Sequence, residues 1–133
     1  AEKKSLKIFC ILYKKYETLD SSYTQIINAG PIEFLSLFRY ASFVVTNSFH
    51  GTAFSIMFNK QFYSIPPLKG RERIDSLLQE LDLTDRIYSK QLAVQGASID
   101  YNTVNKKLSI LRDKSCNFLN NALNRSNNEH PLC

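Results

Sequence analysis

The sequence lacks several features by which whole classes of protein are identified. No stretch approaches the roughly 18 to 20 consecutive apolar residues that a membrane-spanning helix needs. The start, AEKKSLKIFC, has no apolar region ending in small residues, as a secretory signal would. There is no glycine-rich dinucleotide fingerprint and no Walker motif. We therefore expect a soluble cytoplasmic protein, with a peripheral position at the inner face of the membrane left open, and these absences weigh against an ATPase or a dehydrogenase.

Cysteine is scarce as well. Cys10, Cys116 and Cys133 are far apart and odd in number, so they form neither a disulfide framework nor a paired metal-ligand motif. We interpret them as reduced structural thiols. The acidic residues show no spacing that demands metal binding or acid–base chemistry. We interpret the following acidic residues as surface charge: Glu33, Asp75, Glu80, Asp82 and Asp85. The sequence thus argues against a zinc enzyme.

What is present is the composition of one globular domain. The chain has 133 residues, of which 44% are hydrophobic and 22% charged, enough for a single core over residues 1–133. Its net charge of +5 suits an anionic ligand, but the basic residues are scattered and no nucleic-acid-binding signature accompanies them. The chain begins with Ala1 instead of Met, which suggests a piece of a longer protein.

Strand and helix signals alternate along the chain. Short apolar, β-branched and aromatic runs predict strands, the first of them buried on both faces, and apolar residues at helical spacing behind capping residues predict helices. The predicted strands are 6–12, 43–46 and 61–65, and the predicted helices are 31 to 40 or 41, 47–59, 71–81 and a long helix that Asp100 caps. Residues 13–30 are polar and irregular, and the tail 125–133, which contains His130, is expected to be disordered.

This order predicts an α/β fold. Alternating strands and helices imply a Rossmann-like parallel sheet with helices on both faces, and the long C-terminal helix is expected to pack across one face. In such folds ligands bind just beyond the carboxyl ends of the strands. The turn at 46–52, which follows the strand 43–46, lies at such an end.

That turn combines hydroxyls, an amide, an imidazole and a glycine at a predicted helix N-terminus, where free backbone N–H groups attract anions. Gly51 would let a ligand approach the backbone, and Ser48 or Thr52 would donate hydrogen bonds. His50 would donate a charge-assisted hydrogen bond or a proton. The turn alone also fits a simpler interpretation, in which Asn47 or Ser48 only caps the helix and His50 is structural.

Three basic residues, Lys69, Arg71 and Arg73, follow the next predicted strand and open the next helix. Arg73 is the strongest candidate for a ligand contact, because the apolar residues that follow it anchor its helix and a guanidinium can form two bonds to one phosphate or carboxylate. A solvated basic loop explains the three residues equally well.

Several stretches together resemble the polysaccharide pyruvyl transferase family. They are GPIEFL at 30–35, ASFVVTNSFHGTAFS at 41–55, Arg73-Ile74 with Leu77-Leu78, Asp85-Arg86-Ile87, Ile99-Asp100-Tyr101 and the end of the last helix at 115–123. The motif VTNSFHGT is specific, and its order after GPxEFL makes coincidence a poor explanation. The resemblance spans nearly the whole chain.

The resemblance implies the C-terminal half of a two-domain fold of the glycosyltransferase-B type, with the N-terminal half absent and the last helix crossing back to it. It implies transfer of pyruvate from phosphoenolpyruvate to two hydroxyls of a sugar, as a cyclic ketal in surface polysaccharide biosynthesis, without a metal or organic cofactor. The acceptor, a sugar or a lipid-linked oligosaccharide, would be contacted mainly by the missing half, so this chain alone would be inactive.

On this resemblance His50 would be the catalytic residue, and the residues that would bind phosphoenolpyruvate are Asn47, Ser48, Gly51, Thr52 and Arg73. No residue stands out as the general base. Two alternatives stay open. One is the donor-binding domain of a glycosyltransferase or sugar-nucleotide epimerase, which presents a similar turn to a diphosphate. The other is a binding domain without catalysis.

Overall fold

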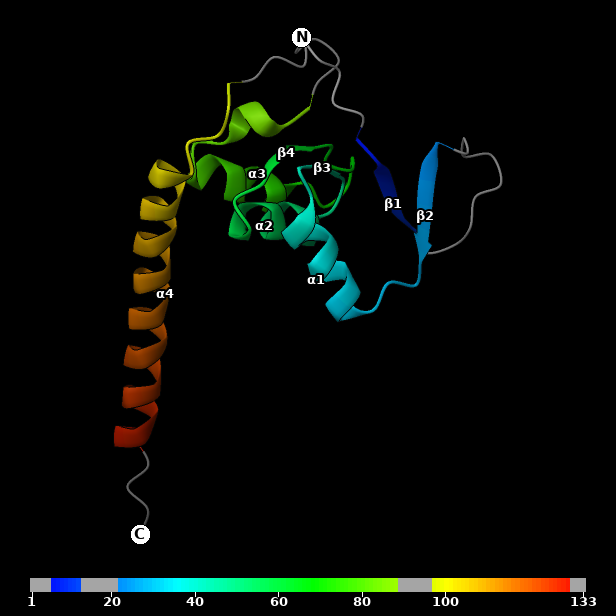
Figure 1. Ribbon diagram of the computed structural model, residues 1–133. Coiled ribbons are helices and arrows are strands. Elements are labelled where there is room, and N and C mark those ends of the chain that lie inside the picture. Colours follow the sequence, from blue (N-terminus) through cyan, green and yellow to red (C-terminus); the bar gives the residue numbers. More distant parts are fainter. Residues whose placement is uncertain (1–5, 13–21, 89–96, 130–133) are drawn as a thin grey trace. The chain divides into compact units, whose positions relative to one another are not determined.

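The computed structural model describes residues 6–12, 22–88 and 97–129 (Figure 1). These residues form an α/β protein with two small parallel sheets, four α-helices and a short 3-10 helix. Within these ranges no helix combines the length and the apolar character that a membrane crossing requires. The α/β class, the parallel strand pairing and the long last helix expected from the sequence are confirmed. The chain divides into two compact units, residues 1–41 and 42–133.

The first unit contains a two-stranded parallel sheet of β1 (Ile8–Leu12) and β2 (Tyr23–Ile27). The strands are aligned so that their first residues face each other and their last residues do the same. The prediction that residues 13–30 are irregular was wrong for β2. Its sequence, YTQII, is rich in strand-forming residues, but it is short and follows a polar stretch.

The burial of β1 also differs from the prediction. A strand buried on both faces was expected, whereas Ile8, Phe9 and Ile11 are exposed in the structure. The reason is that β1 pairs only with β2 among the described residues, so it is an edge strand of a small sheet instead of a central strand.

The helix of the first unit, α1 (Pro31–Tyr40), begins and ends as predicted. Pro31 occupies the first turn, where its missing N–H leaves no bond unmade, and Gly30 precedes it with extended backbone. Glu33 lies in the first turn and complements the helix dipole. The rings of Phe34 and Phe38, one turn apart, lie 4.9 Å from each other.

The second unit is built on β3 (Phe43–Thr46) and β4 (Gln61–Ser64), which are parallel and joined through α2 (Phe49–Met57). A single parallel bridge between Ser64 and Ile87 extends this sheet on the β4 side. The predicted strand and the predicted helix start at the 46–52 turn are therefore confirmed, and the turn follows the carboxyl end of β3.

The core of the second unit lies where α2, α3 (Glu72–Glu80) and the first turns of α4 (Tyr101–Glu129) pack against β3 and β4. A 3-10 helix, η1 (Thr84–Arg86), follows α3. The buried apolar residues of this core are Ile56, Phe62, Ile74, Leu78, Leu81, Leu83, Ile99 and Val104. Ile74, Leu78 and Leu81 are at most 2% exposed and Leu77 packs against them, which confirms the apolar stripe predicted for the helix at 71–81.

The start of α4 is fixed by the predicted cap. The carboxylate of Asp100 accepts hydrogen bonds from the backbone N–H of Asn102 at 3.0 Å and from the hydroxyl of Thr103 at 2.6 Å. These bonds to the charged form lower the pKa of Asp100, the bond from Thr103 most of all. In the next position, Tyr101 reaches back to the end of α2 and donates its hydroxyl to the carbonyl of Lys60, with the carbonyl of Ser55 at 3.4 Å from the same oxygen.

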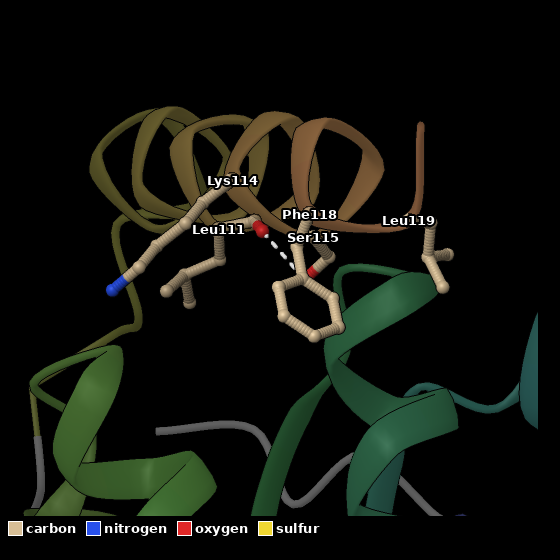
Figure 2. A pocket seen from close by; sticks show the side chains of 5 residues that line it. All are labelled: Leu111, Lys114, Ser115, Phe118 and Leu119. Carbon is tan, nitrogen blue, oxygen red and sulfur yellow. Dashed lines mark hydrogen bonds between the residues drawn. The ribbon is translucent and has the colours of Figure 1, made fainter. Parts of the chain in front are cut away.

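Among the α4 residues whose side chains the structure describes, those that pack on the core lie in the first half of the helix. Leu108 and Leu111 lie against it, whereas Phe118, Leu119 and Leu123 are 73%, 58% and 64% exposed. Figure 2 shows Leu111, Phe118 and Leu119 projecting from the same side of the helix. The helix also runs through residues 125–129, where a disordered tail was predicted, and residues 130–133 lie outside the described ranges.

Candidate anion-binding site

The turn between β3 and α2 is held by its own hydroxyl groups. Ser48 caps α2 from an extended backbone conformation, and its Oγ accepts a hydrogen bond from the backbone N–H of Gly51 at 3.0 Å. The backbone N–H of Ser48 donates to Oγ1 of Thr46 at 3.2 Å. The capping interpretation of Ser48 is therefore confirmed, and the turn has one defined conformation.

Gly51 is required at its position because the turn is tight. A Cβ atom at residue 51 would overlap the hydroxyl of Thr46, and it would lie 2.9 Å from Thr46 Cβ and 3.0 Å from Ser48 Oγ. Gly51 itself is buried. The sequence predicts that this glycine gives a ligand access to the backbone, and the structure shows that it lets the end of β3 pack against the first turn of α2.

A second set of hydroxyls lies beneath the turn. Thr52 is fully buried and its Oγ1 donates to the carbonyl of Ser48 at 3.0 Å. Because that bond uses the only hydroxyl proton of Thr52, Ser64 must be the donor in the 3.2 Å contact between their hydroxyl oxygens. Ser55 donates to the carbonyl of Gly51 at 2.7 Å. Thr52, expected to donate to a ligand, instead donates within the protein.

The outward side of the turn carries Asn47, Ser48 and His50, all of which are exposed. The backbone N–H groups of Phe49 and His50, at the first two positions of α2, have no hydrogen-bond acceptor within the described ranges. They are the unpaired donors of the helix start. An anion placed there would accept their hydrogen bonds and interact favourably with the helix dipole.

Arg73 joins this site from α3. Its guanidinium carbon lies 5.0 Å from the centre of the Phe49 ring, a cation–π distance. The side chain is exposed and forms no ion pair with any residue the structure describes. The contact brings a free guanidinium to the start of α2, in the same unit as the turn.

The neighbouring basic residue is already paired. Arg71 donates to the carboxylate of Asp75 through Nε at 2.8 Å and through Nη2 at 3.4 Å. The hydrogen bond to Asp75 raises the pKa of Arg71 above its ordinary value, and the charge of Asp75 adds to the effect. The structure thus separates the basic residues that the sequence left equivalent, because Arg71 is held by an acid and Arg73 is not.

Phe49 is the residue of this site that sequence reasoning missed. It was treated as part of a motif, without a role of its own. Its ring is half-buried and packs against the core, and it also contacts Arg73 and lies 5.9 Å from the ring of His50 at an interplanar angle of 78°. An aromatic residue between two polar residues at a helix start was the signal that could have identified it.

Other features of the second unit offer less chemistry. Arg86 is buried, and its Nη2 donates to Asp85 at 2.7 Å and to the carbonyl of Ala97 at 2.5 Å, so it holds the chain before α4 in place. The concavity in Figure 2 is lined by α4 alone, and the hydroxyl of Ser115 in it already donates to the carbonyl of Leu111. Across the described ranges, no group of three or more His, Cys, Asp or Glu residues could hold a metal ion.

A family model described as polysaccharide pyruvyl transferase matches residues 2–67. This span contains both GPIEFL and VTNSFHGT, and it ends before Arg73, α3 and α4, so the wider resemblance inferred from the sequence is supported over these residues only. No curated protein and no solved structure matches the chain.

Proposed function

Residues 2–67 of this chain belong to the polysaccharide pyruvyl transferase family, and from this premise we propose that the chain binds phosphoenolpyruvate at the start of α2 for transfer of its pyruvyl group to a sugar. The observation that carries the proposal is the position of Arg73. Its unpaired guanidinium lies against the ring of Phe49, the first residue of α2, and the N–H groups of Phe49 and His50 have no acceptor within the described ranges. Two kinds of anion-binding group therefore occur at the start of α2.

Phosphoenolpyruvate has two anionic groups, a phosphate and a carboxylate, and this pair of binding groups suits it. Arg73 can contact either group through two parallel hydrogen bonds. The N–H groups of Phe49 and His50, with the outward side chains of Asn47 and Ser48, can accommodate the other. Gly51 and Thr52 act from within, since their contacts fix the turn in the conformation that exposes these donors.

The proposed reaction forms a cyclic ketal. Two hydroxyls of one sugar form C–O bonds to C2 of the donor, C3 gains a proton, and the C2–O bond to phosphate breaks. One hydroxyl proton is balanced by the proton gained at C3, and the other leaves with the phosphate. As C2 develops oxocarbenium character, the phosphate takes up negative charge, and fixed cationic and N–H groups stabilise it there. We assign to His50 a charge-assisted bond or a proton for that leaving phosphate.

We extend the proposal to the whole enzyme. In this proposal the enzyme has a Rossmann-like sheet and a two-domain glycosyltransferase-B arrangement. A second domain binds the sugar or lipid-linked oligosaccharide, and this chain alone is inactive. The exposed stripe of Phe118, Leu119 and Leu123 supports this part. It continues the face of α4 that packs on the core and offers apolar surface for a further contact.

The test is a titration of the chain with phosphoenolpyruvate, followed by amide NMR shifts. We expect saturable shifts at residues 46–52 and around Arg73. Arg73→Gln should weaken binding by about 10- to 100-fold, the equivalent of a lost hydrogen bond to a charged group. Arg71→Gln is the matched control, because it removes the same charge from the same end of α3 at a side chain already paired with Asp75.

Two results would contradict the proposal. In one, the Arg71 and Arg73 variants weaken binding equally, which would mean that binding depends on the overall positive charge and not on a specific contact with Arg73. In the other, a nucleoside diphosphate shifts the turn and phosphoenolpyruvate does not, which would favour the glycosyltransferase-like alternative. Phosphate release by the longer protein, compared between wild type and His50→Ala, tests the chemical step separately.

A further inference from the structure

Phe49 links three parts of the second unit. It is the first residue of α2, its half-buried ring packs against the core, and it contacts the guanidinium of Arg73 on α3 at 5.0 Å. The same ring lies 5.9 Å from the ring of His50. Because the core holds the ring, the position of Phe49 is set by the fold and does not depend on a ligand.

The contact matters because Arg73 has little else to hold it. The side chain is exposed and has no ion pair among the described residues. A free arginine side chain samples many rotamers, and ordering it on ligand binding opposes affinity. Arg71 shows the alternative, since its guanidinium is ordered by Asp75 but its N–H groups are used in that pair.

A ring orders a guanidinium in a different way. The attraction comes from the negative face of the aromatic ring, so it requires no carboxylate and leaves the charge of the arginine uncompensated. Arg73 is thereby held at the start of α2 with its charge available to an anion. A carboxylate in place of the ring would hold Arg73 equally well and would repel phosphate.

We infer that Phe49 is a positioning residue, whose ring fixes the Arg73 guanidinium beside the free N–H groups of α2 and so preorganises the anion site. The identity of the anion as phosphoenolpyruvate rests on the proposed function, whereas the contact between Phe49 and Arg73 does not. At a partly exposed site such a contact corresponds to about a two- to five-fold effect on binding.

The variants are Phe49→Leu, which keeps an apolar side chain for the core, and Phe49→Tyr, which keeps the ring. Phe58→Leu is the matched control, because it removes the same ring from the other end of α2. The first readout needs no ligand: the NMR shift and relaxation of the Nε–H group of Arg73. We expect Phe49→Leu to move the shift and increase the motion, and Phe49→Tyr and Phe58→Leu to preserve both.

The second readout is affinity for phosphoenolpyruvate and for inorganic phosphate. Phe49→Leu should weaken binding two- to five-fold in the wild-type background and have no effect when Arg73 is already Gln, since the ring acts through Arg73. If Phe49→Leu weakens binding equally in both backgrounds, Phe49 has a purely structural role and the inference is wrong.

The two hypotheses fail in different ways. If the wild type binds neither phosphoenolpyruvate nor phosphate, the proposed function fails, and the Nε–H signal of Arg73 still decides whether Phe49 orders it. If the wild type binds and that signal is the same in Phe49→Leu as in wild type, the positioning role is wrong and the proposed function stands.

Discussion

Replacing Gly51 by alanine sets two physical effects against each other. Gly51 lies in the first turn of α2, and helix propensity alone would make alanine more stable there by about 1 kcal/mol. Packing predicts the opposite result. The added Cβ would overlap the Thr46 hydroxyl, which can rotate, and would also lie 2.9 Å from Thr46 Cβ, which the backbone of β3 holds in place.

The magnitude follows from these two terms. Overpacking destabilises a protein by about 1–3 kcal/mol, and because the added Cβ would meet two atoms of Thr46 we expect about 2–3 kcal/mol here, from which the gain in helix propensity of about 1 kcal/mol is subtracted. We expect Gly51→Ala to lower the free energy of unfolding by about 1–2 kcal/mol, measured in urea by circular dichroism. At about 4–8 °C per kcal/mol for a unit of this size, Tm should fall by roughly 5–15 °C.

Thr46→Ala provides the partner variant. It removes the hydroxyl that Gly51→Ala would overlap, so the effect of Gly51→Ala should be smaller in that background, with a coupling energy of at least about 0.5 kcal/mol. If Gly51→Ala is as stable as wild type or more stable, the close packing of β3 on α2 is refuted. If the two substitutions are simply additive, Thr46 is not the neighbour that Gly51 accommodates.

Two further predictions concern the start of α4. Tyr101→Phe removes a hydroxyl that donates to the carbonyl of Lys60, and should lower the free energy of unfolding by about 1 kcal/mol at neutral pH. Burial raises the pKa of Tyr101 above its ordinary value near 10. The stabilisation by the Tyr101 hydroxyl is therefore complete below about pH 10 and is lost as pH rises through the pKa of the folded state. The difference in free energy of unfolding between Tyr101→Phe and wild type should shrink accordingly at alkaline pH. Asp100→Ala should lower Tm at pH 7, and because the pKa of Asp100 is lowered in the folded state, this difference should disappear as pH falls through that pKa. Asp100→Asn keeps a cap that does not titrate, and an acid dependence unchanged in that variant would contradict the role of the carboxylate.

The parts of the fold that the sequence predicts well are those whose signals are local. α1 has proline in its first turn, and α4 has an aspartate cap followed by apolar residues at helical spacing. β3 is a run of aromatic and β-branched residues. β2 was missed because its run YTQII is short and follows a polar stretch, so local composition did not separate it from the loop before it.

The candidate site, too, could be predicted from the sequence only in part. The residue types at the turn are visible in the sequence, but their orientations are not. Thr52 and Ser48 are both hydroxyl residues of one motif, and only the structure shows that Thr52 is buried against Ser64 while Ser48 is exposed. Likewise, Arg71 and Arg73 differ through a single contact each, with Asp75 for one and Phe49 for the other.

The structural and functional interpretations of the turn are therefore complementary, and they apply to different residues. Capping and packing account for Ser48, Gly51 and Thr52, whose contacts all lie within the second unit. They do not account for Arg73, whose exposed charge lies beside a helix start that already carries unpaired donors. Positive charge at a helix N-terminus opposes the helix dipole, so in the absence of an anion this repulsion offsets part of the stabilisation that Arg73 gains from the ring of Phe49. An anion between the two removes that conflict, which is the physical reason for assigning a ligand to this turn.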